Sequence, residues 1–195
     1  MANTLLRHVV VVGAAAAAML TAAVVRADVA ASAELKQVGA TAIVYKGPQV
    51  DVVLSYRFAK LNSGGDWLLL DTAMTAAEGP IEVPRGAFSV RTPTGEIVPL
   101  ATQQALAKDY AVLAAPIARA DFTREPMGYL IPRRTRHLRY FAERRPALVF
   151  PTEWLDEHHN SAGRLFFQIP GGVPRGAYEL LIDLPGSHVS IPFTI

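Results

Sequence analysis

"VDVVLSYRFAKLNSGGDWLLLDTAMTA", residues 50–76, is the stretch that decides the fold. Apolar and polar residues alternate from Val50 to Phe58, as in a strand with one buried face. Residues 61–66, LNSGGD, are turn formers, and WLLLDTAMTA (67–76) then resumes an apolar extended run. The stretch predicts two antiparallel neighbouring strands, the first of which continues through Phe58.

The same pattern recurs on both sides of this pair, with turn signals every eight to twelve residues. Pro84 and Pro99 place their segments at sheet edges or bulges, because proline cannot donate a ladder hydrogen bond. The pattern predicts an all-β sandwich. Its further strands are ATAIVY (40–45), AFSVR (87–91), EIVPL (96–100), GRLFFQIP (163–170), AYELLIDL (177–184) and VSIPFTI (189–195).

One segment departs from the strand pattern. TQQALAKDYAVLAA, residues 102–115, is rich in helix-favouring residues, begins with Thr102 as an N-cap and is followed by Pro116. The sequence therefore predicts one short inserted helix that ends before Pro116.

Five of these segments, in this order, resemble exported bacterial immunoglobulin-like β-sandwich domains of unassigned function. They are VDVVLSYRFA, WLLLDTAMTA, FSVRTPTGEIVPL, GRLFFQIPGGV and YELLIDLP. The resemblance covers most of residues 40–195 and implies a single antiparallel immunoglobulin-like domain. It implies no catalytic residues, since such domains share none, and fold alone does not assign a function.

The N-terminal residues 1–27 have the pattern of an export signal. Arg7 precedes an apolar run from Val9 to Val25, and Val25-Arg26-Ala27 is a small-x-small cleavage site. A cut after Ala30 or within 31–33 fits nearly as well, and an uncleaved membrane anchor is the alternative. Residues 28–39 are then a short lead, and the protein is expected in the periplasm or outside the cell. The chain has no cysteine, which excludes disulfides and lipid attachment through a cysteine.

Charge is distributed unevenly. The chain has 19 basic and 17 acidic residues, and without Arg7 and Arg26 the two counts are equal. RRTRHLRYFAERR, residues 133–145, holds six arginines and one glutamate, so this segment carries +5 and the rest of the mature chain −5. Such an asymmetry concerns surface potential and partners.

This arginine-rich segment is the predicted partner-binding site. As a strand or as a helix from Pro132, it leaves most guanidinium groups exposed to bind phosphates, sulfates or carboxylates. The expected partner is an anionic envelope component, such as lipid headgroups or acidic polysaccharide, or an acidic protein, and not nucleic acid. The alternative is that the arginines pair with the domain's own acidic surface and protect a sheet edge. The candidate residues are Arg133, Arg134, Arg136, Arg139, Arg144, Arg145 and Tyr140.

Catalysis and metal binding have less support. No G-x-S-x-G motif or cysteine nucleophile occurs, and GGVPRG (171–176) leads into a strand, unlike a phosphate-binding loop. DEHHN (156–160) gathers three weak metal-ligand candidates, Asp156, His158 and His159, in a predicted polar loop. We therefore expect a non-enzymatic interaction module without a cofactor. The sequence does not predict its oligomeric state. A small metal-binding protein using His158 and His159, and an adaptor that captures peptides at a sheet edge, are the alternatives.

Overall fold

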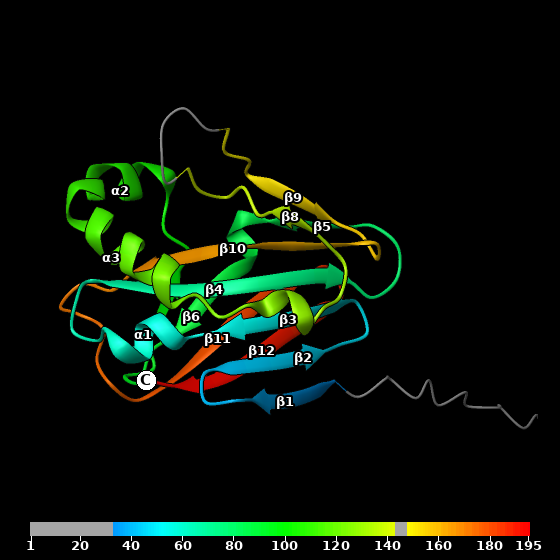
Figure 1. The fold of residues 1–195 in the computed structure, drawn as a ribbon, viewed down its shortest axis with the longest axis horizontal. Helices are drawn as coiled ribbons and strands as arrows, with labels where there is room; N and C mark the ends of the chain where they lie inside the picture. The colour runs from blue at the N-terminus through cyan, green and yellow to red at the C-terminus, as the bar shows by residue number, and fades with distance from the viewer. Residues whose placement is uncertain (1–32, 143–147) are drawn as a thin grey trace, which may run out of the picture.

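The computed structural model describes residues 33–142 and 148–195 and shows a mostly β protein. Its larger sheet has six strands in the order β1-β2-β3-β4-β10-β8 (Figure 1). Every pairing in it is antiparallel except that of β8, which runs parallel to β10. The bounds are β1 Glu34–Val38, β2 Ala42–Lys46, β3 Val50–Ser55, β4 Trp67–Ala76, β8 Arg134–His137 and β10 His159–Gln168.

A second sheet of four strands, in the order β12-β11-β6-β7, is fully antiparallel. A separate pair, β5 with β9, is also antiparallel. The bounds are β5 Ile81–Pro84, β6 Phe88–Arg91, β7 Ile97–Pro99, β9 Thr152–Leu155, β11 Ala177–Leu184 and β12 Ser187–Thr194, and a 3-10 turn, η1 Arg85–Ala87, joins β5 to β6. Pro99 lies in the edge strand β7, as predicted.

The two large sheets share one apolar core. From β4, Leu68, Leu70 and Met74 enter this core, and residues of β11 and β12 such as Leu180 and Ile191 meet them from the other sheet. All ten residues of β4 are buried, so its outward-facing residues are covered as well. A strand that is buried on both faces is apolar along most of its length, as WLLLDTAMTA is.

Helices cover the outer face of the six-stranded sheet. They are α1 Arg57–Leu61, α2 Gln103–Lys108 and α3 Tyr110–Thr123, followed by a 3-10 turn, η2 Met127–Tyr129. Leu106, Leu113 and Ile117 pack there against Leu69 of β4 and Phe166 of β10. In Figure 1, α3 lies over β4 and β10. The protein therefore has three layers: sheet, sheet and helices.

The prediction of one helix over 102–115 was wrong in its extent. Thr102 is the N-cap, and its side chain accepts a hydrogen bond from Ala105 N–H. A second helix then starts at Tyr110 and continues through Pro116 to Thr123. Proline removes one helical hydrogen bond, but Leu113, Ile117 and Ala120 form an apolar face across it, and packing of that face holds the helix together.

The first predicted strand was also too long. β3 ends at Ser55, and Phe58 lies in α1. Tyr56 still faces the core between the sheets, whereas Phe58 packs under the helices with Trp67. Alternation therefore predicted the burial of Phe58 correctly but placed it on the wrong side of the sheet.

Two further boundaries differ from the prediction. β1, Glu34–Val38, pairs with β2 although it falls in the expected lead 28–39. β10 begins at His159 and not at Gly163, because His159 and Asn160 pair with the arginine-rich strand β8. The β3–β4, β6–β7 and β11–β12 antiparallel neighbours are confirmed, while the export signal 1–27 lies outside the described residues.

Gly163 lets the chain after β8 cross closely over β10. A Cβ atom added to Gly163 would lie 2.6 Å from Leu138 Cβ and 3.2 Å from the Leu138 carbonyl oxygen. Leu138 is fixed there, because it is buried and its N–H donates to Ala162 at 2.8 Å.

We therefore expect Gly163→Ala to lower the free energy of unfolding by about 1–3 kcal/mol, the usual cost of overpacking. Urea titration followed by circular dichroism measures this loss. The control is Gly86→Ala, where an added Cβ meets no atom within 4 Å. Equal stability of the two variants would contradict the close approach of Leu138 to Gly163.

Candidate functional site

The structure uses most of the described arginines of the 133–145 segment for internal contacts. Arg133 donates to Thr75 Oγ1 at 2.9 Å and to the Glu157 carbonyl. Arg136 forms an ion pair with Asp156 at 2.9 Å. These contacts connect β8 and the residue before it to the end of β4 and to the turn between β9 and β10.

Arg139 and Arg134 complete the described part of this segment. The Arg139 guanidinium lies 3.4 Å from the Glu153 carboxylate and 4.0 Å from the centre of the Phe150 ring. Arg134 is exposed, and no hydrogen bond or ion pair joins its side chain to another described residue. Arg144 and Arg145 lie outside the described residues. The predicted surface therefore keeps only Arg134 as a described arginine without such a contact.

Tyr140 is part of the core, not of a binding surface. Its side chain is fully buried. Its hydroxyl donates to the Val83 carbonyl at 2.6 Å, and its ring meets the edge of Phe88 at a centroid distance of 5.4 Å. Burial, assisted by the charge of Glu153, raises the pKa of Tyr140 above its usual range despite the opposing charge of Arg85. The assignment of Tyr140 to partner binding was wrong, because its ring fills the core behind β5.

The histidines of DEHHN do not converge on one point. His159 Nδ1 lies 2.8 Å from Asp156, and its Nε2 lies 3.1 Å from Arg136. His158 is exposed and lies 3.4 Å from Glu157. Across the described part of the chain, no group of three or more His, Cys, Asp or Glu side chains is arranged to hold a metal ion.

Asp156 organises this turn. Its Oδ1 accepts hydrogen bonds from the backbone N–H groups of His158 and His159, each at 2.8 Å. Desolvation raises the pKa of Asp156, but the hydrogen bond with the His159 ring, these backbone bonds and the charge of the ring together lower it more, to about 2. Because the folded pKa is below the unfolded value of about 3.9, Asp156 stabilises the fold above pH 4, and this contribution is lost between about pH 4 and pH 2.

We expect Asp156→Asn to lower the thermal midpoint at pH 6, with the difference from the wild type shrinking as the pH falls towards 2. Differential scanning calorimetry over this pH range measures it. Asp66→Asn is the control, since no side-chain hydrogen bond joins Asp66 to a described residue. A difference that stays constant from pH 6 to pH 2 would show that the loss comes from the shape of the side chain and not from its charge.

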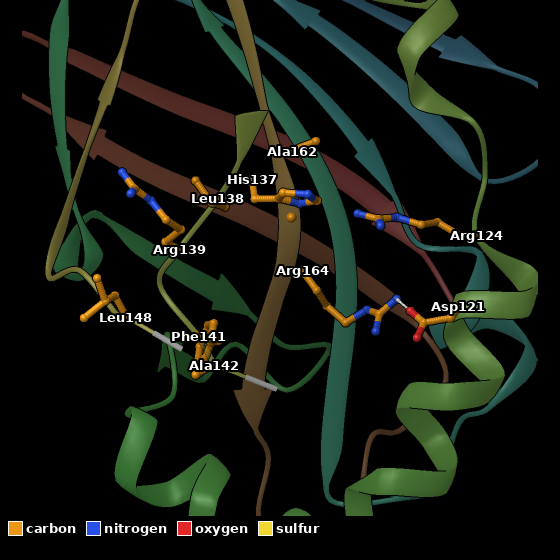
Figure 2. Close-up of a pocket in the computed structure, with 11 residues that line it drawn as sticks. Asp121, Arg124, His137, Leu138, Arg139, Phe141, Ala142, Leu148, Ala162 and Arg164 are labelled. Carbon is orange, nitrogen blue, oxygen red and sulfur yellow. Dashed lines mark hydrogen bonds and ion pairs between the residues drawn. The ribbon is translucent and has the colours of Figure 1, made fainter. Parts of the chain in front are cut away.

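A groove on the outer face of the six-stranded sheet brings cationic groups together. It has a volume of about 590 Å³ and opens between the end of α3, strand β10 and the segment that follows β8 (Figure 2). Figure 2 shows Arg139 on one side of β10, Asp121 and Arg124 on the other, and the His137 side chain over the strand. The lining residues are Asp121, Arg124, His137, Leu138, Arg139, Phe141, Ala142, Leu148, Ala162, Gly163 and Arg164.

A buried ion-pair network lies beneath this groove. Arg164 and Asp71 are cross-strand partners on β10 and β4, and Arg164 Nε lies 3.1 Å from Asp71 Oδ1. A second nitrogen of Arg164 lies 3.1 Å from Asp121 of α3, and Arg124 Nε lies 3.7 Å from Asp71. Burial raises the pKa of Asp71, while the charges of Arg164 and Arg124 oppose this shift.

The wall of the groove that residues 140–142 form is held by contacts with β10, η1 and α2. Beside the buried Tyr140, Phe141 packs edge-on against Phe166 at 4.8 Å. Arg85 lies 4.3 Å from the centre of the Phe141 ring and donates to the Tyr140 carbonyl. The Gln103 side chain accepts from Ala142 N–H at 3.0 Å and donates to the Ala142 carbonyl at 3.2 Å. This wall is therefore preformed.

The sequence reasoning missed the groove and its network. The available signal was a single charge inside each of two apolar strands, Asp71 in WLLLDTAMTA and Arg164 in GRLFFQIP. Charges on buried strands require partners, so each of these residues indicates the other. Arg124 and His137 carry no comparable signal.

The network predicts a large effect of removing one partner. Arg164→Met leaves Asp71 buried without its nearest cation, so we expect the free energy of unfolding to fall by about 3–5 kcal/mol. The double variant Asp71→Leu/Arg164→Met removes both buried charges, so most of this loss is expected to be recovered. Chemical denaturation of the three proteins gives the comparison.

The exposed Arg175, 3.4 Å from Ser63 Oγ, supplies the control. Arg175→Met is expected to change stability by no more than about 0.5 kcal/mol. A double variant as unstable as Arg164→Met would mean that Asp71 does not impose the cost.

Within residues 33–142 and 148–195, no helix is long and apolar enough to span a bilayer. Searches of protein-family models, of curated proteins and of solved structures find no match to this chain.

Proposed function

We propose that this protein is a non-enzymatic binding module for an anionic ligand, and that the ligand binds in the groove between α3, β10 and the segment after β8. One observation carries the proposal: Arg124, Arg139, Arg164 and His137 line one preformed groove in which Asp121 is the only carboxylate lining residue that the structure describes. Guanidinium groups donate forked hydrogen bonds to carboxylates and phosphates.

The internal contacts of these arginines support binding. Arg164 is held by Asp71 and Asp121, and Arg139 by Glu153 and Phe150. Cations fixed in this way lose little conformational entropy when a ligand arrives. Guanidinium groups stay protonated at neutral pH, so they suit recognition better than acid-base catalysis.

The groove also has apolar walls. Leu138, Phe141 and Leu148 line it beside the cations, and its volume lies within the range of small-ligand pockets, about 300–1,000 Å³. This combination favours an amphiphilic anion, in which a carboxylate or phosphate adjoins an apolar group.

Cell location and fold class are further proposals. The pattern of residues 1–27 supports an exported protein whose anionic partner belongs to the envelope. The facing of two sheets around one core supports an immunoglobulin-like sandwich. Against that class, β1 to β4 are neighbours in chain order and β8 joins in parallel, which differs from Greek-key sheets. Metal binding through His158 and His159 and peptide capture at a sheet edge stay predictions.

The test compares the groove with the exposed surface of β8, where the sequence predicted partner binding. Titration calorimetry of the purified protein uses hexanoate and hexyl phosphate as anionic probes, and hexanol and hexyltrimethylammonium as neutral and cationic controls. We expect the anions alone to bind, and Arg124→Gln to weaken them at least about tenfold through loss of a charge-assisted contact.

Arg134→Gln is the matched control, because Arg134 is exposed and does not line the groove. It should leave the affinity unchanged. Loss of binding in Arg134→Gln but not in Arg124→Gln would move the site to the surface of β8. Equal binding of hexanol and hexanoate would refute anion recognition.

A further inference from the structure

Large apolar side chains project from the helical layer into solvent. The exposed fractions are 64% for Leu61 of α1, and 75% and 92% for Val112 and Phe122 of α3. Val112 and Phe122 both lie away from the buried face of Leu113 and Ile117. At 3.6 residues per turn, they lie about 100° and about 180° from Leu113 around the helix axis. None of these three side chains belongs to a core cluster.

A shallow hollow connects the two helices that carry these residues. It has a volume of about 390 Å³, and Leu61, Val112, Pro116 and Arg119 are among its lining residues. Leu61 and Val112 thus belong to one continuous surface between α1 and α3. Phe122 lies one turn beyond Arg119 on the same helix.

The same layer is cationic. Helices α1, α2 and α3 contain four basic residues, Arg57, Lys60, Lys108 and Arg119, and one acidic residue, Asp121. The carboxylate of Asp121 is engaged by the buried Arg164. Among the described residues, no ion pair engages Arg57, Lys108 or Arg119, and Asp66 is the one carboxylate that lines the hollow. The exposed helical surface therefore carries an excess of positive charge.

We propose that this face, defined by Leu61, Val112 and Phe122 with Arg57, Lys60 and Arg119 around them, docks on an anionic phospholipid surface. Exposed apolar side chains among basic residues are typical of helices that lie in the membrane interface. A side chain as exposed as that of Phe122 projects from the protein surface. A projecting side chain can insert between lipid headgroups, whereas binding of a peptide requires a groove that encloses it.

The interaction is peripheral and independent of the anion groove. It uses other side chains, so groove ligands and vesicles can be tested separately. Loss of hexanoate binding would therefore leave this proposal intact, and absence of vesicle binding would leave the groove proposal intact.

The absence of cysteine from the chain allows a site-specific test. A fluorophore sensitive to polarity is attached at Ala115→Cys, an exposed α3 position between Val112 and Phe122, in the otherwise unchanged full-length chain. Vesicles contain either equal parts of phosphatidylglycerol and phosphatidylcholine or phosphatidylcholine alone. We expect a blue shift of the emission with the anionic vesicles only, and a weaker response as salt is raised.

Two controls separate this face from other membrane contacts. The first is the same label at Ile97→Cys, an exposed position on the edge strand β7 of the opposite sheet, which should not respond. The second replaces Leu61, Val112 and Phe122 by serine in the Ala115→Cys chain, and vesicle partitioning reported by the label should fall at least about tenfold.

The outcomes are distinct. No response at position 115 with either vesicle, or an equal response at positions 115 and 97, would overturn the proposal. A response that survives the triple serine variant would also overturn it. Circular dichroism of the triple variant checks its fold, and no loss of stability is expected because none of the three side chains is buried.

Discussion

The ion pair between Arg164 and Asp71 is the constraint on which the arrangement of layers depends. Both charges lie on the outer face of the six-stranded sheet, between an apolar cluster under α2 and α3 and another under η2. Buried charges must be paired, and Asp121 and Arg124 at the end of α3 complete the pairing. The register of β4 against β10 and the position of α3 are therefore fixed by the same group of side chains.

A second set of contacts extends this polar layer. The next residue, Glu125, accepts hydrogen bonds from Thr41 and Ser55, each at 3.2 Å. Asp121, Arg124 and Glu125 thus join the end of the helical layer to strands β3, β4 and β10. The anion groove opens beside these residues, so its cations are positioned by the same network that anchors α3.

The described arginines of the 133–145 segment have a different role in the folded protein from the one that the sequence predicted. A cluster of charge in the sequence indicated a surface for partners, yet Arg133, Arg136 and Arg139 contact Thr75, Asp156 and Glu153 of their own domain. The alternative, that the arginines pair with the domain's own acidic groups at a sheet edge, describes the contacts of Arg136 and Arg139. Arg133 instead donates to a hydroxyl and to a backbone carbonyl. β8 is indeed an edge strand.

Local patterns predicted the strands well, because alternation and turn residues are signals that lie within about ten positions of one another in the sequence. The hairpins of β3 with β4 and β6 with β7 follow from such signals. The end of β3, the passage of α3 through Pro116 and the parallel pairing of β8 depended on contacts between distant segments, such as Ile117 with Phe166. The groove has the same origin: Arg124, His137 and Arg164 are far apart in the chain, and only the folded sheet brings them together.

The central position of β4 has a consequence for how the protein reaches its fold. β1 to β4 pair in chain order, and two turns and the segment that contains α1 connect them. β10 then pairs Ser161 with Met74 and Gln168 with Trp67, partners 87 and 101 positions apart. Closing so long a loop costs conformational entropy before the contacts between β4 and β10 can stabilise the sheet. The helices α2 and α3 rest partly on Phe166 of β10, so their final packing has to wait for this late strand.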